Sequence, residues 1–566
     1  MATVTINGQD IAVDDHEKLN VIQAAKRAGV EIPHYCWHPA LSVVASCRMC
    51  LVELGEKKPD GSVMMQPRLT PACQMPAKHG TVVVTNSKKV KDAQAATLEY
   101  LLLNHPLDCP TCDQAGECWL QDYSFRFGRP ESRLKEPKEL HPDKDHIGEH
   151  ITLFTDRCVM CTRCVRFTRE YSGTSELQIV NRGTRSEIDI YPGQPCDNKL
   201  AGNVVDLCPV GALCSKDFLY KQRVWWLKSR ESVCPNCSTG CSIHVDENNE
   251  RVYRLRPREN PLAQGHFMCD EGRFGFGYIH SSERLTHPVM KSTGVVTNGS
   301  GMAAPDWAAI LGHVRTSFTQ QTAANPSGVV GIFSPWMTCE DAFLLASWLR
   351  SLSSGVRLVM GPVPVVGEDD LYPKNWRGEP VHPPRFVIRA EKCPNRRGVA
   401  AVLRHFQSQE VNFEEVLNDA GGGDVQSAYV AHNGPDGWLS DEQIRSLSQI
   451  PHLVVQDVLN ADLAKAAAVV LPGASFAEKD GTFVNHAGLA QMIKRSIRCP
   501  AEGYTDGRIF MELAGRGGLF NARVVRQEMS SVIPYFAPLS VGDLGEYGIR
   551  LEQPAAAAAM QEQLAR

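Results

Sequence analysis

Cysteine carries the strongest chemical signal in this sequence, because its twenty copies are unevenly distributed. Seventeen lie between Cys36 and Cys269, and only Cys339, Cys393 and Cys499 follow. Several occur as Cys-x2-Cys, a spacing that lets one loop place two thiolate ligands on a metal centre. A disulfide framework suits a small secreted domain, whereas this chain has 566 residues and no evident secretory signal. The pattern therefore favours metal binding.

The first set of candidate ligands has the spacing C-x10-C-x2-C-x22-C and consists of Cys36, Cys47, Cys50 and Cys73. An iron–sulfur cluster needs soft thiolates that converge on one point. The preceding sequence predicts a hairpin over residues 3–6 and 9–13 and a short helix over residues 20–28. This combination resembles a β-grasp ferredoxin that holds a [2Fe–2S] cluster. Zinc and buried free thiols are the alternatives.

The second set places a histidine ahead of three cysteines and consists of His105, Cys109, Cys112 and Cys118. A histidine next to a proline is normally a surface residue, but this one precedes a cysteine triplet in a tight loop. An imidazole in place of one thiolate makes the ligand set less negative and alters the reduction potential. We therefore expect these four residues to hold a [4Fe–4S] cluster.

The third set is a cysteine triplet completed by a distant Cys-Pro pair, and consists of Cys158, Cys161, Cys164 and Cys208. Two-cluster ferredoxins carry such a run twice, and each fourth cysteine serves the other cluster. Here the positions of the second triplet are occupied by Asn198, Ala201 and Val204. The sequence resembles a two-cluster ferredoxin that has kept one [4Fe–4S] cluster. We expect the left-over Cys196 and Cys214 to be plain thiols.

The fourth set has the spacing C-x2-C-x3-C-x27-C and consists of Cys234, Cys237, Cys241 and Cys269. Zinc is a fair competitor for any four-cysteine site. The spacing nevertheless resembles the [4Fe–4S] module of molybdopterin oxidoreductases. The expected cofactors are therefore one [2Fe–2S] and three [4Fe–4S] clusters, with iron bound through these sixteen residues.

The elements that must position these ligands differ along the chain. Ser87 predicts the start of a helix that ends near Leu103, just before His105. From about residue 300, alternating strand and helix patterns indicate a parallel α/β layer. Its expected elements are strands at 329–333, 427–431 and 467–471 and helices at 340–352 and 441–447, with a flexible break at 421–423 and an Ala-rich helix or tail at 554–566.

The fold class expected from these patterns is α+β followed by α/β. The expected domains are a β-grasp ferredoxin domain at 1–85, a [4Fe–4S] module with one histidine and three cysteine ligands at 86–128, a [4Fe–4S] ferredoxin-like domain at 140–220, a [4Fe–4S] module at 227–285, a degenerate molybdopterin oxidoreductase-like α/β domain at 286–535 and a tail at 536–566.

Composition and charge exclude several functional classes. Hydrophobic residues make up 43% and charged residues 22%, as in soluble globular proteins, and the net charge is −5. No basic block suggests nucleic-acid binding. No apolar run is long enough for a transmembrane helix, and the N-terminus resembles neither a signal nor a transit peptide. The sequence also has no P-loop and no dinucleotide-binding fingerprint.

Six segments together resemble the large iron–sulfur subunit (the G subunit) of NADH:quinone oxidoreductase, respiratory complex I, over essentially the whole chain. They are SCRMCLVE at 46–53, HPLDCP at 105–110, GNVVDLCPVGAL at 202–213, CDEGRFG at 269–275, RAEKCPN at 389–395 and ASFAEKDGTF at 474–483.

The resemblance implies a subunit that relays electrons from an NADH/flavin subunit through iron–sulfur clusters towards quinone, coupled in the whole complex to proton translocation. It implies no complete catalytic site in this chain alone. The implied partners are the NADH/flavin subunit and other peripheral-arm subunits. The implied location is peripheral, on the cytoplasmic side of a bacterial inner membrane, which the chain contacts only through the complex. The retained fourth cysteine set also favours a bacterial origin, since some members of the family, including mitochondrial ones, lack it.

Two departures bear on the C-terminal region. The α/β stretch, from about residue 300 to 535, is shorter than a complete molybdopterin oxidoreductase domain. Glu271 stands where such enzymes typically have a lysine, and Cys339, Cys393 and Cys499 lack metal-binding motifs. We therefore expect a structural remnant without molybdopterin.

Three other functions compete with the complex I interpretation. A formate dehydrogenase subunit would need a cysteine or selenocysteine ligand for molybdenum, and Cys339 is the only cysteine within reach. The second alternative is a hydrogenase subunit, including one of an NAD-linked complex. An [FeFe] hydrogenase would need a Cys-rich catalytic domain, which the three scattered cysteines after Cys269 cannot supply. A scaffold bearing structural zinc is the third, and the loop with His105 and three cysteines counts against it.

Overall fold

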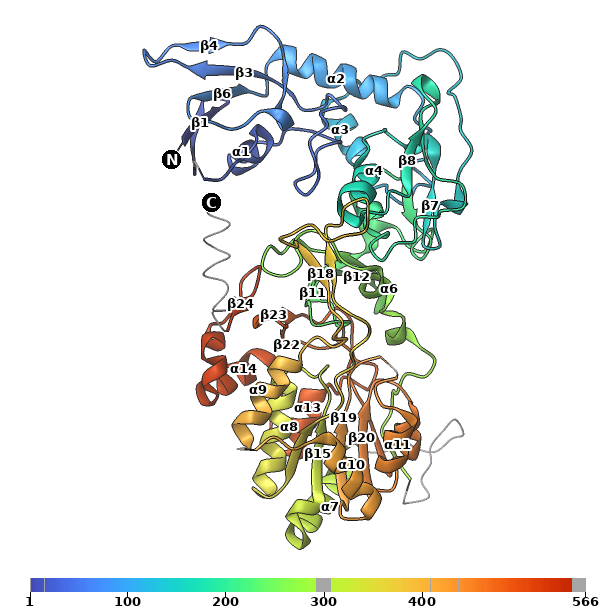
Figure 1. Ribbon diagram of the computed structural model, residues 1–566, viewed down its shortest axis with the longest axis vertical. Coiled ribbons are helices and arrows are strands. Elements are labelled where there is room, and N and C mark those ends of the chain that lie inside the picture. Colours follow the sequence, from blue (N-terminus) through green and yellow to red (C-terminus); the bar gives the residue numbers. More distant parts are fainter. Residues whose placement is uncertain (1, 15, 292–306, 408, 436, 552–566) are drawn as a thin grey trace. The chain divides into compact units, whose positions relative to one another are not determined.

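The computed structural model describes residues 2–14, 16–291, 307–407, 409–435 and 437–551. The chain divides into two compact units, each with its own sheets and cores (Figure 1). The first unit comprises the residues up to Leu227 together with Tyr372–Pro384, and the second comprises Lys228–Leu371 and the described residues from Arg385 onwards. The expected Ala-rich helix or tail at 554–566 lies outside the described residues. Within the described ranges, no helix has the length and apolar character needed to cross a membrane.

The first unit begins with a mixed sheet in the strand order β2-β1-β6-β3-β4, with β5 paired to β3. Its strands are β1 (Ala2–Ile6), β2 (Gln9–Val13), β3 (Leu51–Lys57), β4 (Val63–Met65), β5 (Thr70–Pro71) and β6 (Thr81–Val84). The predicted hairpin is confirmed: β1 and β2 pair antiparallel around Asn7 and Gly8, which both have the positive φ that an Asn-Gly turn requires.

Helix α1 (Val21–Arg27) packs its buried side against this sheet, and it matches the predicted helix. Its start is fixed by a capping box, in which the Asn20 side chain accepts a hydrogen bond from the Gln23 backbone and the Gln23 side chain accepts one from the Asn20 backbone. The chain leaves the helix through Gly29, whose φ is +70°. Sheet and helix together form the framework for the loops of the first cysteine set.

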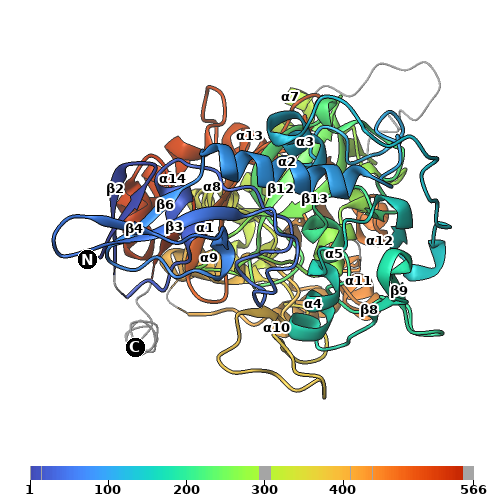
Figure 2. The ribbon, with the colours of Figure 1, turned by 90° about the horizontal axis from the view of Figure 1, so that it is seen from above.

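Helix α2 (Lys88–Leu102) then leads the chain to the second cysteine set. As predicted, the Ser87 side chain caps it by accepting a hydrogen bond from the backbone N–H of Val90 at 3.3 Å. Helix α2 lies beside β3 and beside α3 (Trp119–Phe127), which begins directly after Cys118 (Figures 1 and 2). The loop that carries His105 and the three cysteines therefore connects two helices that pack against each other.

The rest of the first unit is built from short elements, as predicted. They are β7 (Ile151–Leu153) paired with β10 (Leu213–Ser215), β8 (Leu177–Val180) paired with β9 (Glu187–Ile190), and the helices α4 (Arg163–Phe167) and α5 (Asn203–Leu207). Helix α4 follows Cys161 and contains Cys164, while Cys208 directly follows the last residue of α5. The ligands of the third set therefore lie at the ends of short helices.

The second unit opens with an antiparallel sheet of β11 (Lys228–Val233), β12 (Ser242–Asn248) and β13 (Arg251–Pro257). The loop between β11 and β12 carries three cysteines of the fourth set. Helix α6 (Asp270–Phe274) begins directly after the fourth member, Cys269. The fourth set is therefore supplied by the loop that joins β11 to β12 and by the residue that precedes α6.

A six-stranded sheet forms the centre of the second unit, in the order β14-β21-β20-β19-β15-β16. Five strands are parallel, and β14 (Val289–Met290) is antiparallel to β21. The parallel strands are β15 (Val329–Phe333), β16 (Arg357–Met360), β19 (Ser427–Ala431), β20 (His452–Asp457) and β21 (Val469–Pro472). The order in which strands are added reverses between β15 and β19, which defines a doubly wound layer with a topological switch point.

Helices cover both faces of this sheet, so its parallel strands are buried (Figure 1). One face carries α7 (Trp307–Ala324), α8 (Cys339–Leu352), α9 (Arg396–Phe406), α13 (Asp506–Leu513) and α14 (Ala522–Val532). The other face carries α10 (Phe413–Gly422), α11 (Asp441–Leu447) and α12 (Asp462–Ala466). Strand β19 shows the alternation, because Tyr429 packs into the first layer and Val430 into the second. The remaining short strands are β17 (Asp370–Tyr372), β18 (Phe386–Ile388), β22 (Gly481–Val484), β23 (Leu489–Ile493) and β24 (Ile549–Arg550).

The predicted α/β elements agree with the structure except at two places. Strand β21 begins at Val469, two residues later than predicted, because Ala467 caps the end of α12. The predicted flexible break at 421–423 was wrong. Gly421 and Gly422 are the last residues of α10, and Gly423 has a left-handed φ of +83°. Glycine adopts this conformation without the steric penalty of a Cβ, so here it ends a helix.

Candidate iron–sulfur centres

The structure brings the first set together in the loops beside the first sheet. Cys36, Cys50 and Cys73 are buried, and Cys47 is half-buried. The thiol of Cys36 is hydrogen-bonded to those of Cys47 and Cys73, and Cys50 is hydrogen-bonded to Cys73. These bonds lower the pKa of Cys36 and raise that of Cys73, so the four thiols do not ionise independently. Such mutual contact suits a shared metal centre.

The second set lies at a surface pocket of about 500 Å³. His105, Cys109 and Cys118 line this pocket; Cys109 is exposed, whereas Cys112 is buried. Burial lowers the pKa of His105 to about 4 and raises the pKa of Cys118 to about 11. The imidazole of His105 is therefore neutral at pH 7, which is the form that binds a metal.

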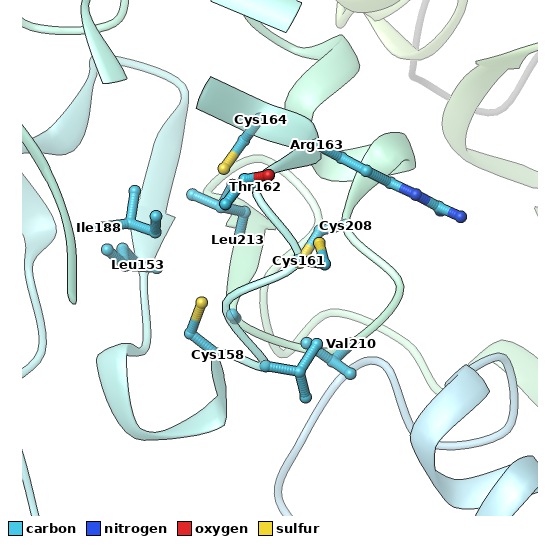
Figure 3. Close-up of a pocket in the computed structure, with 12 residues that line it drawn as sticks. Leu153, Cys158, Cys161, Thr162, Arg163, Cys164, Ile188, Cys208, Val210 and Leu213 are labelled. Carbon is cyan, nitrogen blue, oxygen red and sulfur yellow. The ribbon is translucent and has the colours of Figure 1, made fainter. Parts of the chain in front are cut away.

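The third set lines a single pocket, and Figure 3 shows its sulfur atoms facing a common space. The apolar side chains Leu153, Ile188, Val210 and Leu213 complete the wall. Burial raises the pKa of Cys158, Cys161, Cys164 and Cys208, in the case of Cys161 to about 11. Four thiolates in an apolar pocket need a positive centre to offset the cost of their charge. The donors and the pocket fit an iron–sulfur cluster.

Left-handed backbone conformations shape two of the Cys-x2-Cys loops. Arg48 lies between Cys47 and Cys50 with φ +58°, and Met160 lies between Cys158 and Cys161 with φ +49°. Alternation of right- and left-handed residues turns successive backbone N–H groups towards one side, which favours an anion there. The N–H of Met160 accordingly donates to the sulfur of Cys158 at 3.4 Å.

The fourth set is closed by a short backbone contact and by a glycine. The N–H of Cys234 donates to the carbonyl of Cys241 at 2.8 Å, which folds the loop between β11 and β12. A Cβ on Gly272 would lie 2.8 Å from the sulfur of Cys234 and 3.5 Å from that of Cys269. Glycine is therefore required where helix α6 approaches the loop. Burial raises the pKa of Cys234, Cys241 and Cys269.

The second and third sets are neighbours within the first unit. A Cβ on Gly211, in the turn that follows Cys208, would lie 2.2 Å from the sulfur of Cys112. The N–H of Trp119, next to Cys118, donates to the carbonyl of Pro209 at 3.0 Å. The Cys-Pro turn of the third set therefore packs directly on the second set.

Buried hydrogen-bond donors without a partner among the described residues lie beside three of the sets. They are the hydroxyl of Tyr35, which interacts electrostatically with Cys118 and Cys47, Nη1 of Arg157, which interacts with Cys112, and the hydroxyl of Tyr278, which interacts with Cys234. Buried donors normally have an acceptor. Thiolate or sulfide sulfur of a bound cluster would supply one at each place. Sequence reasoning missed these residues because nothing in their local sequence distinguishes them.

No group of three or more His, Cys, Asp or Glu side chains in the described ranges is arranged to hold a single metal ion. The grouping of the four sets rests instead on shared pockets, mutual hydrogen bonds and electrostatic interaction between the thiols. Of the left-over cysteines, Cys196, Cys214, Cys339, Cys393 and Cys499 are all buried.

Sequence reasoning also missed a lysine beside the fourth set. Nζ of Lys392 donates to the carboxylate of Glu271 at 2.5 Å. Burial lowers the pKa of Lys392, but Glu271, Cys237 and Cys269 raise it, and the net shift is upward. The negative charge of Glu271 is therefore compensated, so a positive charge is present beside the fourth set although position 271 itself is not a lysine. Lys392 lies in the segment RAEKCPN, but its partner Glu271 is 121 residues away in the sequence, so their pairing is seen only in the structure.

The switch point of the large sheet is filled by side chains of this chain. Ligands of doubly wound sheets bind outside the carboxyl ends of the strands at this point. Here Trp438 stacks on His432 at 4.7 Å, and Trp336 meets the same imidazole edge-on. A Cβ on Gly361, at the end of β16, would lie 2.2 Å from Trp438. These residues do not fit a molybdopterin nucleotide in this crevice.

Five family models match parts of the chain. They are "2Fe-2S iron-sulfur cluster binding domain" at 1–88, "NADH-ubiquinone oxidoreductase-G iron-sulfur binding region" at 94–133, "NADH-quinone oxidoreductase subunit 3, ferredoxin-like domain" at 148–214, "Molybdopterin oxidoreductase Fe4S4 domain" at 227–281 and "Molybdopterin oxidoreductase" at 397–516. They confirm the expected fold class, including its 2Fe-2S, 4Fe-4S and molybdopterin oxidoreductase domains.

Curated relatives carry matching names. The G subunit of the NADH-quinone oxidoreductase of Rickettsia conorii is 36% identical over 354 residues, 62% of this chain and 50% of the relative. The corresponding protein of Rickettsia bellii is 39% identical over 62% of this chain and 48% of its own length. The NADH-ubiquinone oxidoreductase 75 kDa subunit of Reclinomonas americana is 34% identical over 65% of this chain and 50% of its own length. The chain spans about half the length of these relatives, and the resemblance to their family is confirmed.

Among solved structures, a chain of an NAD+-reducing [NiFe]-hydrogenase in the H2-reduced state is 28% identical and matches 39% of this chain and 91% of its own. The TM-score is 0.34, too low to establish a shared overall fold.

Proposed function

We propose that this chain, a homologue of the G subunits of NADH-quinone oxidoreductases, is an electron-transfer subunit of such a complex. The observation that carries the proposal is the grouping of three cysteine-rich ligand sets within one compact unit, where the second and third sets are in direct contact. Iron–sulfur clusters supply one-electron transfer when bound. The names of the relatives do not favour the formate dehydrogenase or hydrogenase alternatives.

The proposed ligands are those that the sequence predicted, and iron is bound through all sixteen of them. A [2Fe–2S] cluster is held by Cys36, Cys47, Cys50 and Cys73, and three [4Fe–4S] clusters are held by His105, Cys109, Cys112 and Cys118, by Cys158, Cys161, Cys164 and Cys208, and by Cys234, Cys237, Cys241 and Cys269. What supports the assignment is the burial of most of these cysteines, the raised pKa values of the third-set thiols and the unpartnered donors beside three of the sets.

The protein's own residues perform three tasks in this proposal. Apolar walls such as Leu153 and Ile188 exclude water from the third set. Buried donors such as Tyr35 place a hydrogen bond where sulfur accepts it. His105 replaces one anionic ligand by a neutral one. Ligand charge, burial and hydrogen bonds to sulfur are the means by which a protein sets cluster potentials.

Iron and sulfide analysis of the anaerobically purified chain tests the proposal. Four filled sets correspond to about 14 iron atoms per chain in this scheme. Electron paramagnetic resonance of the reduced protein then separates [2Fe–2S] from [4Fe–4S] signals. Half that iron content together with stoichiometric zinc would show that some sets are structural zinc sites.

The proposed partners are the NADH/flavin subunit and other subunits of the peripheral arm of complex I. In the proposed setting, the chain lies on the cytoplasmic side of a bacterial inner membrane and contacts that membrane only through the complex. The described residues contain no helix that could cross the membrane, and the sequence has no dinucleotide-binding fingerprint. The α/β part of the second unit is proposed to be a structural remnant without molybdopterin, because its own aromatic side chains fill the switch point.

A further inference from the structure

Two arginines of helix α4 are buried with no carboxylate partner among the described residues. Arg163 and Arg166 are each only 3% exposed. In the part of the chain that the structure describes, all their hydrogen bonds run to backbone carbonyls or to the hydroxyl of Thr162. A guanidinium stays protonated in proteins, and a buried charge is costly unless an opposite charge compensates it. The missing countercharge needs an explanation.

The carbonyls that these arginines contact belong to the loops of two ligand sets. Arg166 donates to the carbonyls of Cys36 and Ser42 in the first loop and to that of Cys161, at 3.3 Å, in the third. Arg163 donates to the carbonyl of Trp37, next to Cys36, and to that of Leu207, next to Cys208, at 3.3 Å. Both arginines therefore join the first set to the third.

Arg163 also reaches the second set, since its guanidinium lies 4.5 Å from the ring of Trp119, the residue after Cys118. Figure 3 shows the Arg163 side chain leaving the rim of the third pocket and pointing away from its thiols. It interacts electrostatically with Cys161, Cys36 and Cys208. The positive charge is thus located between ligand sets rather than inside one of them.

Backbone carbonyls orient a guanidinium but bring no net charge. Arg163 interacts electrostatically with Cys36, Cys161 and Cys208, and Arg166 interacts with Cys161. These cysteines are thiolates when a cluster is bound, and four thiolates per cluster leave an iron–sulfur centre with net negative charge. We propose that Arg163 and Arg166 are shared counter-cations and positioning residues of the first and third clusters, which fix the two ligand loops against each other and raise both reduction potentials. The inference rests on the proposed function, because it needs clusters in both sets.

The direction of the effect follows from electrostatics. Reduction adds one negative charge to a cluster, and a nearby cation stabilises that charge more than it stabilises the oxidised form. Removing the cation therefore lowers the potential. A tenfold change in the ratio of reduced to oxidised cluster corresponds to about 59 mV for one electron.

The test is an anaerobic redox titration of the full chain, followed by electron paramagnetic resonance, in four variants. Arg163→Gln and Arg166→Gln remove the charge, Arg163→Lys keeps it, and Arg169→Gln is the matched control. Arg169 belongs to the adjoining segment, but its side chain is 62% exposed and pairs with Glu170. In the Gln variants, the potentials of the first and third clusters are expected to fall. At a given applied potential, the ratio of reduced to oxidised cluster should decrease about tenfold or more, which corresponds to about 59 mV or more. The Lys variant, the control and the fourth cluster are expected to stay unchanged.

The outcomes separate this inference from the proposed function. Unchanged potentials in both Gln variants at full iron content would overturn the inference and leave the proposed function intact. Missing clusters in the unaltered chain would overturn the proposed function itself. If the Gln variants fail to acquire iron while Arg163→Lys acquires it with unaltered potentials, a positive charge is required and the inference stands. Loss of iron from the Lys variant as well would show a purely steric role and refute it.

Discussion

His105 differs from the other proposed ligands because it is neutral when it binds iron. Its side chain is half-buried, and loss of solvation lowers its pKa to about 4. Replacing it with an anionic thiolate in His105→Cys adds a negative charge to the cluster environment, so we expect the potential of this cluster to fall and its resonance signal to change. A redox titration measures both. His16→Cys, at an exposed position of the same unit, is the control, and an unaltered signal in His105→Cys would show that His105 does not bind iron.

Tyr35 tests the role of an unpartnered donor. Its hydroxyl is buried, and burial together with Tyr123, Cys118 and Cys47 raises its pKa. A hydrogen bond to sulfur stabilises the reduced cluster, so Tyr35→Phe is expected to lower the potential of the first or second cluster with little effect on thermal stability.

Tyr100→Phe serves as the control for this comparison, because Tyr100 is 76% exposed on the same unit. Equal potentials in Tyr35→Phe and the unaltered chain would show that the hydroxyl does not contact a cluster.

At the residue scale, the spacing of cysteines, together with resemblance to known cluster modules, suggests the four proposed ligand sets, because two or three ligands of each set share one loop. The residues around the sets were not predictable in this way. Arg163 and Tyr35 acquire their role from segments far away in sequence, and only the folded chain places them beside sulfur. Lys392 shows the same limit, since its partner Glu271 is 121 residues away.

At the element scale, a buried ion-pair network joins the helices of the second unit. Nζ of Lys479, after β21, contacts Asp341 of α8 and Asp506 of α13, each at 2.9 Å. All three side chains are at most 1% exposed. Breaking a buried pair leaves charge without compensation, so Lys479→Met is expected to destabilise the protein by about 3–5 kcal/mol. Thermal unfolding of the full chain measures the loss.

The surface pair Lys465–Asp462 provides the control for that variant. Both side chains are more than half exposed, so Lys465→Met should cost about 0–1 kcal/mol. A Lys479→Met variant no less stable than Lys465→Met would contradict a structural role for the network.

The same network predicts a pH dependence. Burial raises the pKa of Asp341, Asp506 raises it further, and Lys479 opposes the shift. A carboxyl whose pKa is raised by folding binds its proton more tightly in the native state, so it costs stability as pH rises above its ordinary value near 3.8. Without Lys479 the shift is larger. The stability deficit of Lys479→Met is therefore expected to be greater at pH 7 than at pH 4, and an equal deficit at both would rule out this charge effect.

Sequence patterns predicted elements best where a cap or strong periodicity was present. Ser87 fixed the start of α2, and the strand and helix at 427–431 and 441–447 agree with β19 and α11. Strands β16 and β20 were missed, since short apolar runs are ambiguous between buried strands and helices. The glycines at the end of α10 were misinterpreted, because whether a glycine breaks or caps a helix depends on the backbone angle, here at Gly423.

At the scale of the whole molecule, the proposed function makes this chain one part of a complex. The purified chain is therefore expected to carry iron but to show no oxidation of NADH with a quinone. When the NADH/flavin subunit is added, NADH should reduce the clusters of this chain. The change in visible absorbance measures that reduction. Oxidation of NADH by the single chain would disprove this division of labour.

The filled switch point of the second unit predicts its metal content. Elemental analysis of the native protein should find iron without stoichiometric molybdenum or tungsten, and formate should not reduce the clusters. Molybdenum in the native protein would overturn the remnant proposal and favour a formate dehydrogenase.

The first unit is discontinuous in sequence, so the ribosome synthesises its parts at different times. Its segment Tyr372–Pro384 is made 145 residues after Leu227. At roughly 5–20 residues per second, the delay is about 7–30 s. During that time the carbonyl of Tyr171 lacks the N–H of Lys374, and Gly173 lacks the covering backbone of Asn375. In a nascent chain paused within this interval, all cysteines of the ferredoxin-like segment are already translated. Its backbone contacts with Lys374 and Asn375 have not yet formed.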